Sequence, residues 1–245
     1  MTSLLTTALS TLHSLCSSLI PTTNPKRITL LVTGLDNSGK TTLLHRMRKP
    51  AHEPGSGSGS SHTLAFFPIS TSLTDIKLTT TTGKHLVLNP IDLGGFCYRD
   101  HPGGIQQLWR DYLYAADVDG IVLVVDAADW GRLDKAGTLL RDLLGVLGEF
   151  EREGPGASKP IPVLVLGNKI DAVGAVSEKE LRRVMGVPIW GENKRGRSRR
   201  DAEGKGEGEG EATRPVELFM CTVVMGQGYQ EGFEWLAGSL ESELL

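Results

Sequence analysis

The sequence has few of the features that mark secreted, membrane-spanning or nucleic-acid-binding proteins. Its three cysteines, Cys16, Cys97 and Cys221, are scattered, and no pair has the spacing of metal ligands, which favours free thiols in a reducing compartment. The longest apolar runs are far shorter than the roughly 20 residues that a membrane-spanning helix needs. A formal net charge of -3 and an aromatic content of 6% give no broad basic surface, so nucleic acid is not expected as a partner.

The N-terminus also lacks the basic region of a secretory signal, because its first positive charge is Lys26. We therefore expect the body of the protein to be cytoplasmic. Residues 1–21 instead carry apolar side chains at intervals of three or four, opposite a face of Thr and Ser, and Pro21 ends the pattern. From this segment alone two interpretations are open: a helix packed on the domain, or an interfacial helix lying in a bilayer surface.

The remaining residues, 26–245, predict one α/β domain. Apolar runs that indicate buried strands alternate with helical patterns, which predicts a doubly wound, mostly parallel sheet with helices on both faces. The predicted strands are 27–33, a hairpin at 76–80 and 85–88, then 120–127, 161–167 and 216–223, and the predicted helices are 39–48, 133–150, one opened by a capping box at 177–180, and 232–244.

Two stretches interrupt this pattern and predict flexible insertions. Residues 51–62 contain an alternating Gly-Ser sequence. Residues 191–213 consist mainly of Lys, Arg, Glu and Gly, with almost no apolar side chain that a core could bury.

A glycine-rich motif, Gly34-Leu-Asp-Asn-Ser-Gly39-Lys40-Thr41, fits the pattern G-x-x-x-x-G-K-[ST] and lies between a predicted strand and a predicted helix. Glycine lets such a loop turn its backbone N–H groups toward phosphate, next to the positive end of the helix. Lys40 is expected to reach the β- and γ-phosphates, and the Thr41 hydroxyl to bind Mg²⁺.

A second motif, Asn168-Lys169-Ile170-Asp171, follows a predicted buried strand and indicates which base is bound. Asp171 can accept hydrogen bonds from N1 and the exocyclic amine of guanine, and adenine would leave its carboxylate unpaired, which disfavours an ATP-using kinase. Asn168 can either hold the base edge or brace the phosphate loop. The alkyl stem of Lys169 can lie over the base.

A third motif, Asp92-Leu-Gly-Gly95, ends another predicted strand. Asp92 is placed to touch Mg²⁺ through water, and the N–H of Gly95 to contact a γ-phosphate. Because that contact exists only with a triphosphate bound, it can order or release the loop that follows.

Taken together, these motifs and two C-terminal segments resemble the Arf/Sar branch of small GTPases, and the C-terminal segments resemble the Sar subfamily most. The segments are Gly34-Leu-Asp-Asn-Ser-Gly-Lys-Thr-Thr-Leu-Leu-His45, Asp92-Leu-Gly-Gly95, Gly167-Asn-Lys-Ile-Asp171, Arg214-Pro-Val-Glu-Leu-Phe-Met-Cys221 and Gln227-Gly-Tyr-Gln-Glu-Gly-Phe-Glu-Trp235. The resemblance implies a P-loop small-GTPase fold with a six-stranded sheet. It also implies that the protein hydrolyses GTP to GDP with Mg²⁺ as cofactor. It implies that the nucleotide is bound by Gly34, Asp36, Asn37, Ser38, Gly39, Lys40, Thr41, Thr42, Gly95, Asn168, Lys169 and Asp171, with Val223 and Val224 beside the base.

Residue 2 is Thr, whereas N-myristoylation requires Gly at that position. This disfavours ordinary Arf proteins and agrees with Sar proteins, whose N-terminal amphipathic helix is not acylated. The resemblance thus implies that residues 1–21 bind the cytosolic face of the endoplasmic reticulum or the Golgi. The implied partners are the inner-coat subunits of COPII and a membrane-bound exchange factor.

Two departures from the family pattern concern hydrolysis. The family has Thr-Leu-His-Pro-Thr in its first switch, where Thr63 is the best candidate here for an Mg²⁺ ligand, although alignment on Pro68 places Ala65 there. The family also has a His directly after Asp-Leu-Gly-Gly, where this chain has Phe96, and His101 is the remaining catalytic candidate. Since moving a water-positioning group by about 1 Å can cost roughly a hundredfold in rate, an alternative is a GTP-bound structural subunit that hydrolyses poorly, resembling the β-subunit of the signal-recognition-particle receptor.

Overall fold

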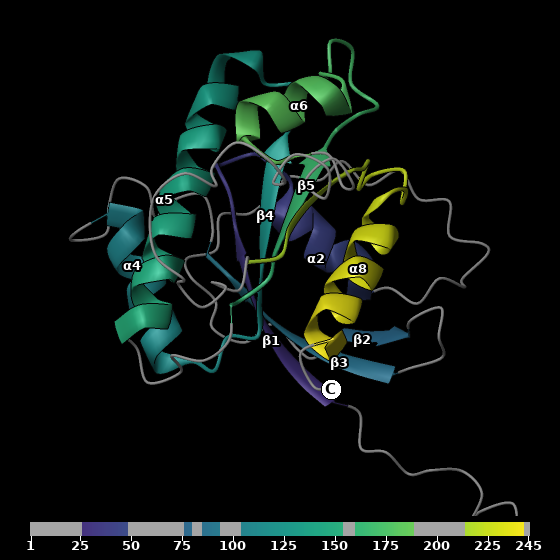
Figure 1. The fold of residues 1–245 in the computed structure, drawn as a ribbon. Helices are drawn as coiled ribbons and strands as arrows, with labels where there is room; N and C mark the ends of the chain where they lie inside the picture. Colours follow the sequence, from purple (N-terminus) through teal and green to yellow (C-terminus); the bar gives the residue numbers. More distant parts are fainter. Residues whose placement is uncertain are drawn as a thin grey trace, which may run out of the picture.

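The structure is a computed structural model that describes residues 26–48, 76–79, 85–93, 104–153, 160–188 and 214–242. Within them, six strands form one sheet in the order β2-β3-β1-β4-β5-β6, and β2 alone of these runs antiparallel to its neighbour (Figure 1). The predicted doubly wound, six-stranded sheet is confirmed. The elements are β1 (Lys26–Thr33), α2 (Lys40–Arg48), β2 (Ile76–Thr79), β3 (His85–Asp92), α4 (Gly104–Ala115), β4 (Gly120–Asp126), the 3-10 turn η1 (Trp130–Arg132), α5 (Leu133–Glu153), β5 (Val163–Asn168), α6 (Glu178–Met185), β6 (Val216–Met220) and α8 (Tyr229–Ser242).

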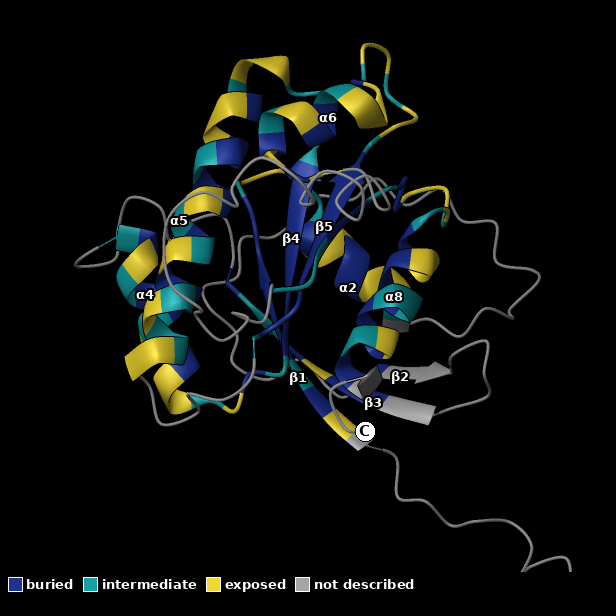
Figure 2. Ribbon diagram, in the orientation of Figure 1, coloured by how far each residue is buried: buried dark blue, intermediate teal, exposed yellow. Residues whose placement is uncertain are grey.

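Helices cover both faces of the sheet, with α4 and α5 on one face and α2 and α8 on the other (Figure 1). The central strand β4 supplies side chains to both cores, because successive side chains of a strand point to opposite faces. Ile121, Leu123 and Val125 pack under α4 and α5, whereas Val122 and Val124 pack under α2 and α8. Both faces of the central strands are therefore buried, as their dark colour in Figure 2 shows. This explains why residues 121–125 of β4 are all apolar.

The ends of the elements follow their local chemistry. Ser177 is the N-cap of α6, and its hydroxyl accepts a hydrogen bond from the N–H of Glu180 at 3.3 Å, as the capping-box sequence predicts. Gly186 ends the same helix in a left-handed conformation. The last strand is shorter than predicted, because β6 ends at Met220 and the chain then forms a turn in which Thr222 bridges to Gln227.

Pro90 lies inside β3, where a missing N–H could have broken the sheet. The N–H of Leu93 donates to Val32 of β1, and alternate residues of a strand direct their N–H groups to the same side. Position 90 therefore faces away from β1, on the side where the pairing of β3 with β2 ends at Leu88. The pairing of β3 with β1 therefore runs past this proline to Asp92.

Two arginines fix the chain on either side of the residues between Pro188 and Arg214. Arg182 of α6 is buried and donates to the carbonyl of Pro188 at 3.0 Å and to the carboxylate of Glu217 at 2.6 Å. Arg214 forms a two-pronged ion pair with Glu151 at 2.5 and 2.6 Å. Both ends are thus held by charge-assisted hydrogen bonds to the domain.

Several predictions lie outside the described residues: the N-terminal segment 1–21, both insertions, Thr63, Ala65 and Pro68 of the first switch, Gly95, Phe96 and His101. Within the described ranges, no helix is long and apolar enough to cross a membrane.

Candidate functional site

The predicted phosphate loop connects β1 to α2 at the carboxyl edge of the sheet, and its shape depends on glycine. Gly34 and Gly39 have φ angles of 142° and 103°, which L side chains rarely adopt. A Cβ atom on Gly34 would lie 2.2 Å from the carbonyl oxygen of Val124, and one on Gly39 would lie 2.3 Å from Nδ2 of Asn168. Asn37 also has a positive φ of 59°, a conformation that asparagine tolerates better than most residues.

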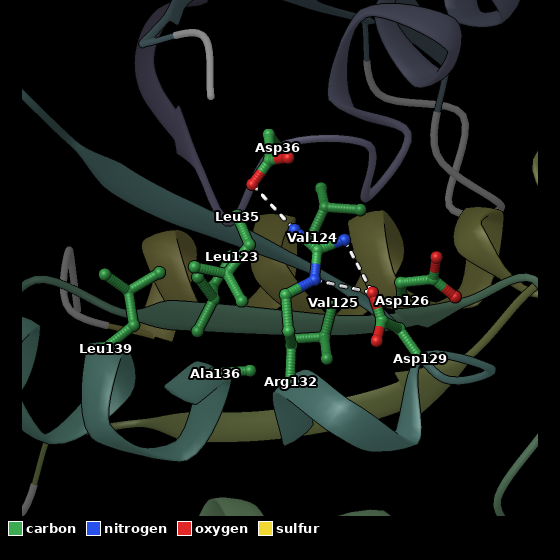
Figure 3. A pocket seen from close by; sticks show the side chains of 10 residues that line it. All are labelled: Leu35, Asp36, Leu123, Val124, Val125, Asp126, Asp129, Arg132, Ala136 and Leu139. Atoms are coloured by element: carbon green, nitrogen blue, oxygen red, sulfur yellow. Dashed lines mark hydrogen bonds and ion pairs between the residues drawn. The ribbon is translucent and has the colours of Figure 1, made fainter. Parts of the chain in front are cut away.

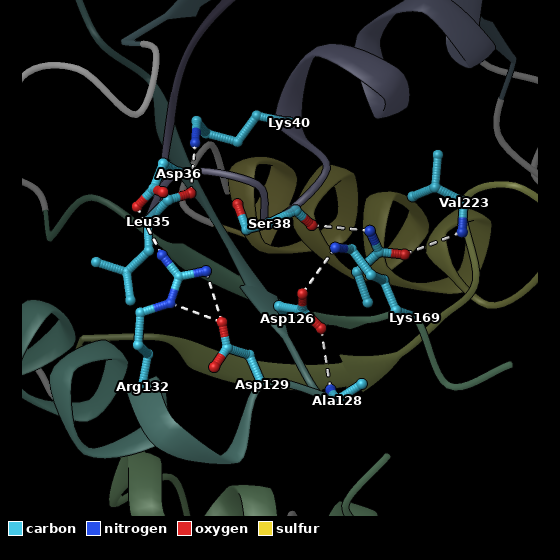
Figure 4. A network of polar contacts seen from close by, with 11 residues as sticks. Leu35, Asp36, Ser38, Lys40, Asp126, Ala128, Asp129, Arg132, Lys169 and Val223 are labelled. Atoms are coloured by element: carbon cyan, nitrogen blue, oxygen red, sulfur yellow. Dashed lines mark hydrogen bonds and ion pairs between the residues drawn. The ribbon is translucent and has the colours of Figure 1, made fainter. Parts of the chain in front are cut away.

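Lys40, the first residue of α2, directs its ammonium group back over this loop. Its Nζ donates to the carbonyl oxygens of Gly34 at 3.0 Å and Leu35 at 2.7 Å (Figure 4). The residue is only 5% exposed, so a positive charge is held at the mouth of a loop that lies against a helix N-terminus. This combination favours an anionic ligand.

Two oxygen ligands suited to Mg²⁺ come together from α2 and β3. The hydroxyl of Thr41 donates to Oδ2 of Asp92 at 3.1 Å. Asp92 is brought there by the parallel pairing of β3 with β1, in which it lies opposite Val32. Among the described residues, no three His, Cys, Asp or Glu side chains form a metal-binding group. A hydroxyl and a carboxylate are oxygen ligands of the kind that Mg²⁺ takes together with phosphate and water.

In the structure Asn168 braces the phosphate loop, which is one of the two roles that the sequence leaves open for it. Its Nδ2 donates to the carbonyl of Ser38 at 2.9 Å, and its Oδ1 accepts from the N–H of Val223 at 3.0 Å (Figure 4). The side chain is 3% exposed. One buried amide thus joins the phosphate loop to the loop that follows β6.

Lys169 and Asp171 follow on the same loop. Lys169 has a positive φ of 69°, and its Nζ lies 2.7 Å from Oδ2 of Asp126 at the end of β4 (Figure 4). The other carboxylate oxygen of Asp126 accepts from the N–H of Ala128 at 3.0 Å. The head of Lys169 is therefore anchored, which fixes the path of its alkyl stem, and Asp171 lies on the exposed turn that follows.

The loop after β6 contains both a predicted and an overlooked residue. Val223 is buried and its N–H is occupied by Asn168, whereas Val224 is 59% exposed. Thr222 was not predicted as a site residue, yet its buried hydroxyl has no hydrogen-bond partner among the described residues. Ser38 in the phosphate loop carries a second such hydroxyl. Orphaned buried polar atoms are costly, and their presence in these two loops agrees with a polar ligand in the site.

Cys221 lies beside Asn168 in the same core. Burial raises the pKa of its thiol to about 12. The thiolate is the reactive form, so this cysteine is chemically inert at neutral pH and serves as a small core residue.

Sequence reasoning also missed Asp126, Asp129 and Arg132, which surround a hollow between β4 and α5 (Figure 3). Arg132 forms ion pairs with Asp129 of its own turn and with Asp36 of the phosphate loop. The hydrogen bond to Asp129 is the main reason that the pKa of Arg132 is raised. One feature of the sequence indicates these residues: they follow the apolar strand β4 directly, and so lie at the sheet edge where the other site residues lie.

The fold and these loops define a P-loop nucleotide-binding protein, with an anion-binding loop, an oxygen pair suited to Mg²⁺ and a second loop suited to a base. The model of the ADP-ribosylation factor family matches residues 12–240, and the chain belongs to that family. Small GTPases of this family hydrolyse GTP, and this chain is a GTP-binding switch protein of the same kind.

Individual relatives are distant and of two types. The chain is 28% identical over 212 residues to the Small COPII coat GTPase SAR1 of Giardia intestinalis, covering 86% of this chain and 89% of that protein. It is also 28% identical over 219 residues to ADP-ribosylation factor-like protein 2 of Arabidopsis thaliana, covering 89% and 90%. The equal identities support the family and do not separate the Sar type from the Arf-like type.

Among solved structures, the fold is similar to that of the Arl6 BBS3 small GTPase from Trypanosoma brucei, which holds the nucleotide analogue GppNp. The TM-score is 0.56 at 22% identity, and the match covers 89% of this chain and 99% of that one. At this identity the likeness supports the fold.

Proposed function

We propose that this GTPase is of the Sar type, and that its GTP form binds the cytosolic face of the endoplasmic reticulum and recruits the inner-coat subunits of COPII. A membrane-bound exchange factor would load the GTP. The proposal is supported by the Sar-like segments 214–221 and 227–235, which include β6 and the start of α8. The likeness to the Giardia coat GTPase agrees with it.

The nucleotide-binding part rests on one observation, the Asn168 amide that joins the phosphate loop to the loop after β6. In the proposed complex the N–H groups of residues 36–42 surround the phosphates, and Lys40 neutralises their charge. Asp171 accepts from the guanine edge, and the stem of Lys169 covers the base. Val223 and Val224 line the side of the base, close to the free hydroxyl of Thr222.

Mg²⁺, when bound, would neutralise phosphate charge and orient the terminal phosphate. Thr41 would hold Mg²⁺ directly, and Asp92 would hold it through a water molecule. Thr63 of the first switch would be a further ligand. The N–H of Gly95 would contact the γ-phosphate, and His101 would orient the attacking water. The chain thereby has one conformation that only a triphosphate stabilises, which is what a switch requires.

The proposal is tested by liposome flotation with purified COPII inner-coat subunits. The chain loaded with a non-hydrolysable GTP analogue should float with liposomes of endoplasmic-reticulum composition and carry the coat subunits with it, whereas the GDP form should not. A variant with Leu9→Ala and Leu12→Ala should lose flotation, because it removes apolar area from the stripe of residues 1–21. Binding of the coat subunits that is absent, or equal in both nucleotide states, would refute the Sar-type assignment.

A second candidate function is favoured by Phe96, which stands where the family has the water-orienting His. Under this alternative the chain stays bound to GTP and serves as a structural subunit. Single-turnover hydrolysis separates the two: slow hydrolysis that Phe96→His accelerates and His101→Ala leaves unchanged supports the structural subunit. Loss of hydrolysis in His101→Ala supports the switch, with the catalytic group displaced along the chain.

A further inference from the structure

Arg132, in the turn between β4 and α5, contacts the phosphate loop. Its Nη1 donates to Oδ1 of Asp36 at 2.7 Å, while its Nε and Nη2 lie 2.6 and 2.5 Å from Oδ2 of Asp129 (Figures 3 and 4). Asp36 and Arg132 are 96 positions apart in the sequence. One guanidinium group therefore connects the residue next to Asn37 to a turn anchored in the core.

Arg132 is well suited to hold another residue, because its own position is fixed. Asp129 engages two of the guanidinium nitrogens, and its carbonyl accepts from the N–H of Arg132 at 3.0 Å, which closes the 3-10 turn. The next residue, Leu133, is 4% exposed and packs in the core under α5. The side chain of Arg132 is only 28% exposed. A planar guanidinium held on one edge points its other edge in a set direction.

Asp36, in contrast, lies in a loop whose conformation costs free energy to maintain. The neighbouring Asn37 has a positive φ, and Gly34 and Gly39 have conformations open mainly to glycine. The Asp36 side chain is 68% exposed, so little packing holds it. It also places a negative charge in a loop suited to bind anions, which a bound polyphosphate would repel unless a cation compensates it.

We propose that Arg132 is a positioning residue of the nucleotide site: it holds the phosphate loop in its anion-binding conformation through Asp36 and compensates the charge of that carboxylate. The inference rests on the nucleotide site of the proposed function. A preorganised loop spends less binding free energy on ordering itself, so the residence time of GDP and GTP depends on the Arg132–Asp36 pair.

The test is a double-mutant cycle on the dissociation rate of a fluorescent GDP analogue, measured on the full chain. Arg132→Ala should raise the rate about fivefold, the factor expected for a partly exposed ion pair. Asp36→Asn should raise it less, because the loop loses its tether but no charge is left uncompensated. The double variant should dissociate no faster than Arg132→Ala, and Arg132→Lys should lie between wild type and Arg132→Ala, since Lys keeps the charge without the fork.

Arg110→Ala is the matched control. Arg110 forms an ion pair of 2.6 Å with Glu149 between α4 and α5, with similar exposure, and it lies away from the loops of the site. The GDP analogue should dissociate from the Arg110→Ala variant at the same rate as from wild type. Higher salt should speed dissociation from wild type more than from Arg132→Ala, since salt screens the ion pair.

The outcomes separate the inference from the proposed function. If wild type fails to retain guanine nucleotide, the proposed function is refuted and the inference with it. If wild type retains the nucleotide but the effects of Arg132→Ala and Asp36→Asn multiply in the double variant, the two residues act independently and the inference alone is wrong. The same holds if Arg110→Ala accelerates dissociation as much as Arg132→Ala, because the effect would then be general destabilisation.

Discussion

The phosphate loop and the loop that begins at residues 168–171, called the base loop because of its proposed contact with guanine, lie at the same edge of the sheet, but they are held in different ways. The phosphate loop takes its shape from backbone conformations that depend on Gly34 and Gly39. The base loop is held by side chains, since Asn168 bonds two other loops and Lys169 is anchored to Asp126. The phosphate loop should therefore be most sensitive to an added side-chain atom, and the base loop to the loss of side-chain atoms. Four substitutions test this difference.

The largest effect is expected from Gly39→Ala in the phosphate loop. The new Cβ would lie 2.3 Å from Nδ2 of Asn168, at a φ of 103°. We expect GDP affinity to fall by at least about a hundredfold, since backbone strain and the displacement of Asn168 add together. Equilibrium titration with a fluorescent GDP analogue measures this. The control is Gly145→Ala on the exposed face of α5, where a Cβ meets no atom within 4 Å and should stabilise the helix.

The next effect is that of Asn168→Ala, which leaves the carbonyl of Ser38 and the N–H of Val223 without their partner in a buried place. The free energy of unfolding without nucleotide should fall by about 3 kcal/mol, as expected when two buried polar groups lose their hydrogen bonds. Denaturant titration followed by circular dichroism gives this value. A change below about 1 kcal/mol would mean that Asn168 does not hold the two loops together.

A smaller effect, with a change of specificity, is expected from Asp171→Asn. In the proposed complex the carboxylate of Asp171 accepts from guanine. The substitution turns it into an amide that can also donate, so GTP should bind about thirtyfold more weakly and xanthosine triphosphate more tightly. Calorimetric titration with both nucleotides measures the exchange of preference. Unchanged affinity for both would exclude Asp171 from the base site.

The smallest effect is expected from Asp126→Asn, which keeps an acceptor for the N–H of Ala128 but removes the charge that anchors Lys169. Dissociation of GDP and GTP should speed up by about fivefold for both nucleotides, because in the proposed complex the stem of Lys169 covers the base and does not touch the phosphates. Stopped-flow fluorescence measures both rates. Asp111→Asn on α4, where the carboxylate accepts from Gln107 at the surface, serves as the control.

The sequence predicted the parts of the molecule that depend on local pattern. The buried strands, the glycine loop and the cap at Ser177 each follow from a few neighbouring residues, and the structure places them as expected. The pairing of Arg132 with Asp36 depends on how β4 and β1 align in the sheet, which no local pattern encodes. The role of Asn168 was open for the same reason, since its two partners come from opposite ends of the chain.

The arginine anchors on either side of the residues between Pro188 and Arg214 have a practical consequence. Arg182 holds the end of one segment and Arg214 the start of the next, each by charge-assisted bonds to residues of the domain. Lengthening the chain between two fixed points costs little, because closure entropy grows only with the logarithm of length. A fluorescent protein or affinity tag placed between these anchors would leave both chain ends where the domain holds them, which makes this the preferred position for labelling the GTPase internally.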